Sequence, residues 1–410
     1  MSAPTAPVAP VSWQAFSAAP HRMLFFGGVL QTVLVMGLWL IALGSRATGA
    51  SDVPWTLPAT WVHAFLMVYG VFPFFIFGFL LTVYPRWMAG PVIPPSRYVP
   101  IFLALVSGML LFYLGLFTAR GVLLAGIVVY LSGWLLAIHA LLGVYRQAQN
   151  RGPHERLLNL ALAFGACGLG AFLAALLGAP VFWFQLAREA GVWLFLVPVV
   201  FLVSHRMIPF FSHSVLMHYL MVRPSWGPSF MLCCVSAHAV LELSGLPQWR
   251  FLADLPLAIA ALHHSWVWQF RRSFHARLLA MLHIAFLWLG IAMTLYALQS
   301  LIVLATGVDV LGRAPLHALG IGFFTGMIVA MASRVTLGHS GRTLHADRLT
   351  WLTLIGINVS ALLRIAGELL PAAGAWLNLL AGVVWLVALA AWAGHYVPIY
   401  LRPRLDGKPG

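Results

Sequence analysis

The chain has 410 residues, of which 62% are hydrophobic and only 8% are charged, and its mean hydropathy is +0.93. Water-soluble domains carry about 25% charged residues, so this composition excludes a soluble protein and indicates a polytopic membrane protein. The formal net charge is +14, but the basic residues stand singly at the ends of apolar runs and form no patch of the kind that binds nucleic acid. We therefore expect the chain to lie in a lipid bilayer and to bind no nucleic acid.

Both ends of the chain are expected to be tails. Residues 1–20 are rich in Ala, Pro and Ser and lack the basic and apolar regions of a cleavable signal peptide, so they predict a flexible N-terminal tail, and 401–410 predict a C-terminal one. No loop between them is long enough for a soluble domain. Residues 21–400 are therefore expected to form a single transmembrane helical domain with an all-α fold.

Apolar runs bounded by Pro, Gly and charge predict about twelve transmembrane helices in one bundle. They are expected near 22–44, 59–84, 98–118, 121–144, 156–178, 182–210, 227–245, 251–270, 276–305, 313–338, 349–370 and 374–400. The even number places both termini on one side. Most basic residues fall on that side, so the positive-inside rule predicts cytoplasmic termini.

The acidic residues lean the other way and are assigned to the outer side, with no carboxylate expected at the middle of a span. This assignment covers Asp52, Glu189, Glu242, Asp254, Asp309 and Glu368. Carboxylate chemistry inside the bilayer is therefore not expected. The sixteen histidines are the only abundant groups able to bind a metal or carry protons there.

The most informative stretch is LHALGIGFFTGMIVAMASRVTLGHSGR, which begins at Leu316. Its apolar run lies between His317 and His339, and at 1.5 Å per residue it spans roughly 33 Å, the hydrocarbon thickness of a bilayer. The span that begins at His63 resembles it, with the same His-Ala entrance and a basic exit at Arg86. An internal duplication is one explanation of this likeness, and chance similarity is the other.

His63 and His317 share a predicted depth near the outer face, which makes them candidates for the axial pair of a b-type haem. Arg46, Arg188 and Arg313 are outer-side candidates to pair with haem propionates. Aromatic and glycine residues that would suit a macrocycle flank the two histidines, although ordinary membrane packing uses the same residue types: Tyr69, Gly70, Phe72, Gly320, Gly322, Phe323 and Phe324.

A second metal site is predicted toward the cytoplasmic face, where several imidazoles would suit copper. Its candidate ligands are His21, His205, His283 and His339. The alternative for any single histidine is an interfacial polar anchor, which is the expectation for His154. By the same reasoning, His263 and His264 are expected in an aromatic belt, and His238 in a hydrogen bond between helices.

Four segments carry a family resemblance: WVHAFLMVYG…GFLLTVYPRW from Trp61, HRMIPFF from His205, LHIAFLWLG from Leu282, and the stretch from His317 to Arg342. Together they resemble the NnrS family, nearly end to end. Family histidines match His63, His283, His317 and His339. Where the family commonly has a second histidine and a glutamate in span two, this chain has Phe65 and Leu66.

The resemblance implies a haem- and copper-containing protein of the bacterial cytoplasmic (inner) membrane, linked to nitric oxide and to resistance against nitrosative stress. Nitric oxide would be its small-molecule ligand, and an electron donor or denitrification proteins would be partners. Whether the chain is an enzyme stays open; if it is, it would be an oxidoreductase acting on nitric oxide. The alternatives are a membrane transporter or metal chaperone without redox catalysis, and a structural subunit of a larger respiratory complex.

Overall fold

The computed structural model describes residues 11–51 and 53–407, and within these ranges it contains helices joined by turns and no strand. The first helices are α1 (Trp13–Phe16), α2 (Pro20–Thr48), α3 (Ala59–Phe65), α4 (Phe72–Trp87), α5 (Pro95–Phe117), α6 (Arg120–Gln147) and α7 (Pro153–Leu176). The later ones are α8 (Phe182–Glu189), α9 (Val197–Val215), α10 (Gly227–Leu243), α11 (Phe251–Val267), α12 (Arg277–Thr306), α13 (Ala314–His317), α14 (Gly326–His339), α15 (Arg348–Leu369) and α16 (Gly374–Leu401). Three short 3₁₀ turns also occur: η3 (Pro247–Trp249), η4 (Phe270–His275) and η6 (Pro371–Ala373).

The prediction of an all-α polytopic membrane bundle is confirmed. Ten helical stretches of the described chain are long and apolar enough to cross a membrane. The predicted spans 227–245 and 251–270 correspond to α10 and α11, which have 17 residues each and lie at the short end of the range for a spanning helix. Because these two helices form a hairpin, the ends of the chain lie on the same side whether or not the hairpin crosses.

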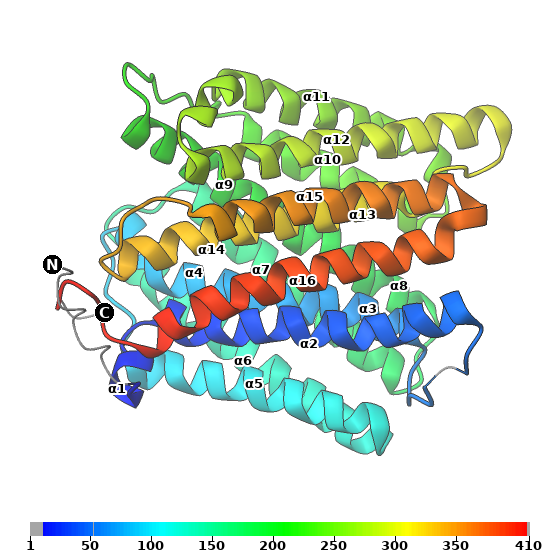
Figure 1. The fold of residues 1–410 in the computed structure, drawn as a ribbon, viewed down its shortest axis with the longest axis horizontal. Helices are drawn as coiled ribbons and strands as arrows, with labels where there is room; N and C mark the ends of the chain where they lie inside the picture. The colour runs from blue at the N-terminus through cyan, green and yellow to red at the C-terminus, as the bar shows by residue number, and fades with distance from the viewer. Residues whose placement is uncertain (1–10, 52, 408–410) are drawn as a thin grey trace, which may run out of the picture.

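The long helices run roughly parallel along the length of the molecule, and α1 lies beside the end of α16 (Figure 1). There the Ser12 amide donates to the Leu401 carbonyl over 3.4 Å. We call this the terminal end of the bundle and the opposite one the far end. The most extensive helix contacts pair α5 with α6, α15 with α16, α11 with α12, and α16 with α2.

The N-terminal segment is packed from residue 11 onward, which differs from the predicted flexible tail over 11–20. The Phe16 ring lies edge-on to Phe26 and Phe102, with centroids 5.2 and 5.8 Å apart. The buried Arg22 guanidinium donates to the Ala15 carbonyl over 2.5 Å. The Phe16 ring contacts and the Arg22 hydrogen bond therefore hold a segment whose Ala, Pro and Ser content predicted a tail. Residues 1–10 of the predicted tail lie outside the described residues.

Burial separates inner from peripheral spans. In the apolar 18-residue segment of each span, the buried share is 89% in Ala59–Trp87 and 83% in Phe182–Val215. It is 72% in Arg277–Thr306 and in Ala314–His339, but only 28% in Pro371–Leu401. The inner spans carry His63, His205, His283, His317 and His339. Peripheral helices instead expose large apolar side chains such as Leu110, Leu136 and Val387, as lipid contact requires. The histidines are therefore concentrated where protein surrounds them.

Three inner spans contain a π-helical segment: η1 (Leu66–Val71), η2 (Ala190–Leu196) and η5 (Ala318–Thr325). His63 lies just before η1, and His317 directly precedes η5, so the two spans that share the His-Ala entrance also share this interruption. Glu189 directly precedes η2. Such π-helical turns are rare and are enriched at functional sites, because the extra residue per turn re-aims the side chains around it.

The α5–α6 pair depends on glycines that allow backbone contact. A Cβ on Gly108 would lie 2.6 Å from the Tyr130 nitrogen, and one on Gly126 would lie 2.6 Å from the Phe112 nitrogen. Small residues at helix interfaces permit this approach in membranes, where association depends on close packing. The glycines therefore set the distance between the two helices.

We expect Gly108→Ala and Gly126→Ala each to destabilise the fold by about 1–3 kcal/mol, because the added methyl group meets backbone atoms that cannot turn away. Gly121→Ala is the control, since a Cβ there meets no atom within 4 Å. Thermal unfolding in detergent measures all three. Equal midpoints for Gly108→Ala and Gly121→Ala would contradict the packing argument.

Candidate metal centres and a buried polar network

The far end of the bundle brings together the two histidines predicted as a haem pair. His63 lies in the last turn of α3 and His317 is the last residue of α13; both side chains are half-buried. Two elements distant in sequence thus place equivalent histidines at one end of the molecule.

The hydrogen bonds of these rings leave nitrogen lone pairs available. His317 Nδ1 donates to the Arg313 carbonyl over 2.9 Å, so its Nε2 carries the free lone pair. Metal-binding histidines commonly hold their second nitrogen in this way. His63 Nδ1 is buried without a hydrogen-bond partner, and its ring stacks on Trp39 with centroids 4.0 Å apart. Both rings therefore fit a metal-ligand role.

Two of the three arginines considered for haem propionates, Arg46 and Arg313, lie at this end of the bundle. Arg46 lies over the Trp39 ring at 4.9 Å, and the exposed Arg313 begins α13. Arg364, from α15, pairs with Glu368 over 2.6 Å. Arg188 lies in a different group, described below. Among the described residues, Arg46 and Arg313 thus lie at the same end as the two imidazoles without a carboxylate ion pair, whereas Arg364 is paired.

The glycines predicted to line a cofactor differ in what they face. A Cβ on Gly320 would meet nothing within 4 Å, whereas Gly322 packs against the Trp288 indole and Gly70 against Leu66. The rings of Phe323 and Phe324 are buried in the hydrophobic core. Space beside η5 is therefore open at Gly320, one turn from His317, and closed at Gly322.

At the terminal end the four candidate metal ligands divide into separate groups. His21 and His339 lie together, with ring centroids 4.8 Å apart, and Thr82 Oγ1 lies 3.4 Å from His21 Nδ1. His283 Nε2 lies 3.1 Å from the Ser212 hydroxyl. His205 instead neighbours His154, over 3.0 Å. Across the described residues no group of three or more His, Cys, Asp or Glu side chains stands in a preformed metal-holding arrangement.

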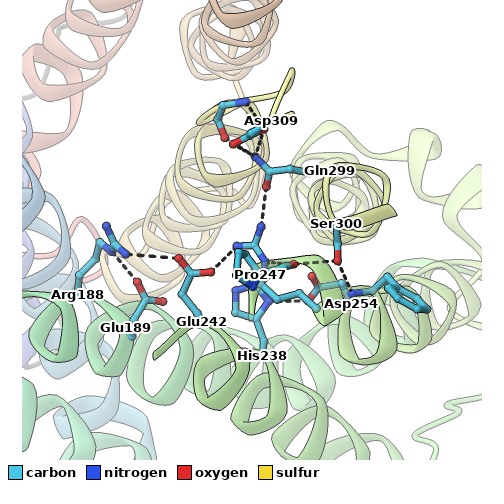
Figure 2. Close-up of polar contacts among 12 residues, drawn as sticks. Arg188, Glu189, His238, Glu242, Pro247, Asp254, Gln299, Ser300 and Asp309 are labelled. Atoms are coloured by element: carbon cyan, nitrogen blue, oxygen red, sulfur yellow. Dashed lines mark hydrogen bonds and ion pairs between the residues drawn. The ribbon is translucent and has the colours of Figure 1, made fainter. Parts of the chain in front are cut away.

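Sequence reasoning missed a network of charged side chains at the far end, which Figure 2 shows. Arg188 donates to Glu189 over 2.5 Å and lies 3.7 Å from Glu242. Arg250 donates to Glu242 over 2.7 Å and to Gln299 over 3.1 Å. Residues of α8, α10 and α12 and the residue that caps α11 thus form one network, whose charges were expected to lie individually outside the membrane.

The same network reaches the turn that carries His317. Gln299 donates to the Asp309 carboxylate over 2.9 and 3.0 Å and to the Gly312 carbonyl over 2.6 Å. Gly312 directly precedes Arg313, whose carbonyl holds His317 Nδ1. The network therefore fixes the chain that positions this histidine.

A buried His–Asp pair completes the group. His238 Nδ1 lies 2.6 Å from Asp254 Oδ1, and the two side chains are 1% and 0% exposed. The Trp193 ring, from η2, covers His238 with centroids 3.6 Å apart. Asp254 Oδ2 is buried without a hydrogen-bond partner. The available signal was a carboxylate inside an apolar run, which membranes tolerate only with a partner.

These features define a class: a polytopic α-helical membrane protein whose inner helices carry imidazoles at both ends. The family model described as NnrS protein matches residues 15–404, nearly the whole chain, and the chain belongs to this family. Membership fits a membrane protein of the nitric oxide response. No curated protein matches the chain by sequence.

We expect His238→Ala to destabilise the protein by about 3–5 kcal/mol, because it leaves the Asp254 carboxylate buried without its partner. His395→Ala is the matched control: His395 faces Asp347 at 3.5 Å, and their side chains are 39% and 44% exposed, where such pairs contribute about 0–1 kcal/mol. Unfolding in detergent compares the two variants. A similar loss of stability in both variants would show that the buried pair contributes no more than the exposed one.

Proposed function

We propose that the chain is a haem- and copper-dependent protein of the bacterial cytoplasmic membrane that binds or processes nitric oxide and so protects against nitrosative stress. The observation that carries this proposal is the placement of His63 and His317 at the far end of two inner spans. Family membership supports the nitric oxide link. The orphaned His63 Nδ1 and the held tautomer of His317 support metal ligation.

In this proposal His63 and His317 would hold the haem, and the chain's own residues would prepare the site. The Arg313 carbonyl keeps the His317 proton on Nδ1, and Trp39 holds the plane of the His63 ring. Arg46, Arg313 and Arg364 supply the positive charge that carboxylate substituents such as propionates require. A bound haem iron supplies a centre for nitric oxide binding or single-electron transfer.

The copper belongs at the terminal end, where the remaining imidazoles lie. Imidazole nitrogen is a favourable ligand for copper. The predicted set of His21, His205, His283 and His339 is divided among three places in the structure, so the four imidazoles do not form one copper site as they stand. If the protein turns nitric oxide over, it is an oxidoreductase, and an electron donor is then required as a partner.

A coupled transporter is the second candidate, and one observation favours it. The sequence predicted no carboxylate at the middle of a span, and Asp254 lies in the first turn of α11. It is nevertheless fully buried, and one of its oxygens lacks a partner. Buried ionisable residues of this kind mark ion pathways in many transporters. Metal or proton uptake by proteoliposomes that is lost in Asp254→Asn would favour this candidate over redox chemistry.

We expect His63→Ala and His317→Ala each to lose most of the haem absorbance of the purified protein, because each would remove one of the two imidazoles proposed to hold the haem. His139→Ala is the control, since His139 is exposed on α6. Oxidised and reduced optical spectra, with and without nitric oxide, give the readout, and circular dichroism verifies the fold. Full haem spectra in both variants would end the assignment.

A further inference from the structure

A second group of imidazoles lies at the terminal end, contributed by three helices. His154 begins α7, His205 lies in α9 and His264 in α11; His205 and His264 are 1% and 0% exposed. His154 Nε2 lies 3.0 Å from His205 Nδ1, and the His205 and His264 rings are 5.6 Å apart. Of these three, sequence analysis singled out only His205 as a ligand.

The hydrogen bonds of His264 determine which of its nitrogens is free. Its Nδ1 lies 2.6 Å from the Ala260 carbonyl, which can only accept, so Nδ1 carries the proton. Nε2 therefore presents a lone pair, and this atom is buried without any hydrogen-bond partner. A buried acceptor left unpaired is unfavourable, and this combination is the usual state of a metal-binding imidazole.

A change of tautomer would free the Nε2 lone pair of His205 as well. In the structure its Nε2 donates to the Pro224 carbonyl over 3.0 Å, and its Nδ1 lies 3.0 Å from His154 Nε2. Because the His154 imidazole can either donate to Nδ1 or accept from it, the His205 proton can move to Nδ1 and free Nε2. His154 thus allows the tautomer that a metal at His205 Nε2 would need.

Gly227, at the start of α10, leaves the space that both Nε2 atoms face. A Cβ at this position would lie 2.7 Å from His264 Nε2 and 3.4 Å from His205 Nε2. The space is therefore open to a small ion only because residue 227 has no side chain. Aromatic rings enclose it, with Trp226 and Trp268 lying 5.2 and 5.1 Å from the His264 ring.

A cleft at the terminal surface reaches His154, the outermost member of the group. This cleft of about 470 Å³ is lined by His154, Glu155, Arg206 and Trp87, among others. Arg206 forms an ion pair with Glu155, and its guanidinium lies over the Trp87 ring. Pairing with Glu155 offsets the arginine charge at the place where a cation would enter.

We propose that His205 and His264 bind a copper ion through their Nε2 atoms in the space over Gly227, and that His154 is a positioning residue that holds the His205 ring. This inference rests on the proposed function for the expectation of copper, and names its ligands. It shares only His205 with the ligand set predicted from the sequence, and it needs two inward-facing nitrogens in place of a preformed group of three.

The test titrates copper(I) into purified, chelator-treated full-length protein against a chromophoric copper competitor. His264→Ala should lower the copper affinity at least 100-fold, and Gly227→Ala should do the same by filling the space while leaving every histidine in place. His154→Ala should lower it about 10- to 100-fold, as the loss of an outer-shell partner does. The matched control is His263→Ala, the half-buried neighbour on α11, which should bind copper normally.

X-ray absorption of the copper-loaded protein should report two imidazole nitrogens, with one lost in His264→Ala. Haem absorbance, which depends on His63 and His317, is measured on every variant, so failure of the haem proposal is visible separately. Unchanged copper affinity in both His264→Ala and Gly227→Ala would overturn the site. So would loss of copper in His21→Ala or His339→Ala in place of His264→Ala, or tight binding of zinc(II) without copper(I).

Discussion

The structure depends on one constraint: inside a bilayer, polar groups must find their partners within the protein, because lipid provides none. The charged residues of the inner helices satisfy it with each other, as Arg250 does with Glu242 and Gln299. Buried nitrogens that do not satisfy it are therefore informative. His63 Nδ1 at the far end and His264 Nε2 at the terminal end are two such atoms, and the second lies beside another histidine, His205.

The same constraint connects the far-end network to the turn that positions His317. Asp309 and Gly312 form the turn before α13, and Gln299 fixes both of them from α12. The carbonyl of the next residue, Arg313, sets the tautomer of His317. A change at Gln299 would therefore reach the imidazole through three covalent or hydrogen-bonded steps, and the ion pairs act as a support for the candidate ligand.

Much of this arrangement was predictable from the sequence, because depth in a membrane is a one-dimensional property. Span lengths follow from apolar runs, and the run from His317 to His339 places these histidines at opposite ends of one helix. What could not be predicted is which helices are neighbours around the bundle. His205 shares its depth with His21 and His283, yet side-by-side packing gives it His154 and His264 as partners.

The missed residues have a related cause. Glu189 and Asp254 lie one or two turns inside the far end of their helices, so a reading based on loop charges assigned them to the outside. The packing of η2 and α11 against α10 buries these positions, and there Trp193 covers His238 while Asp254 pairs with it. The π-helical turn after Glu189 contributes to this, since it re-aims the residues that follow by one extra position per turn.

The two imidazole groups are separated by most of the length of a spanning helix, which has a mechanistic consequence. His317 and His339 bracket a run of roughly 33 Å, and His205 and His264 lie at the same end as His339. Groups this far apart with no shared partner contribute independently, so a ligand lost at one end leaves the geometry of the other intact. Metal bound at both ends, as proposed, would therefore occupy two separate sites in one bundle, and any coupling between them would have to pass through the inner helices that carry both.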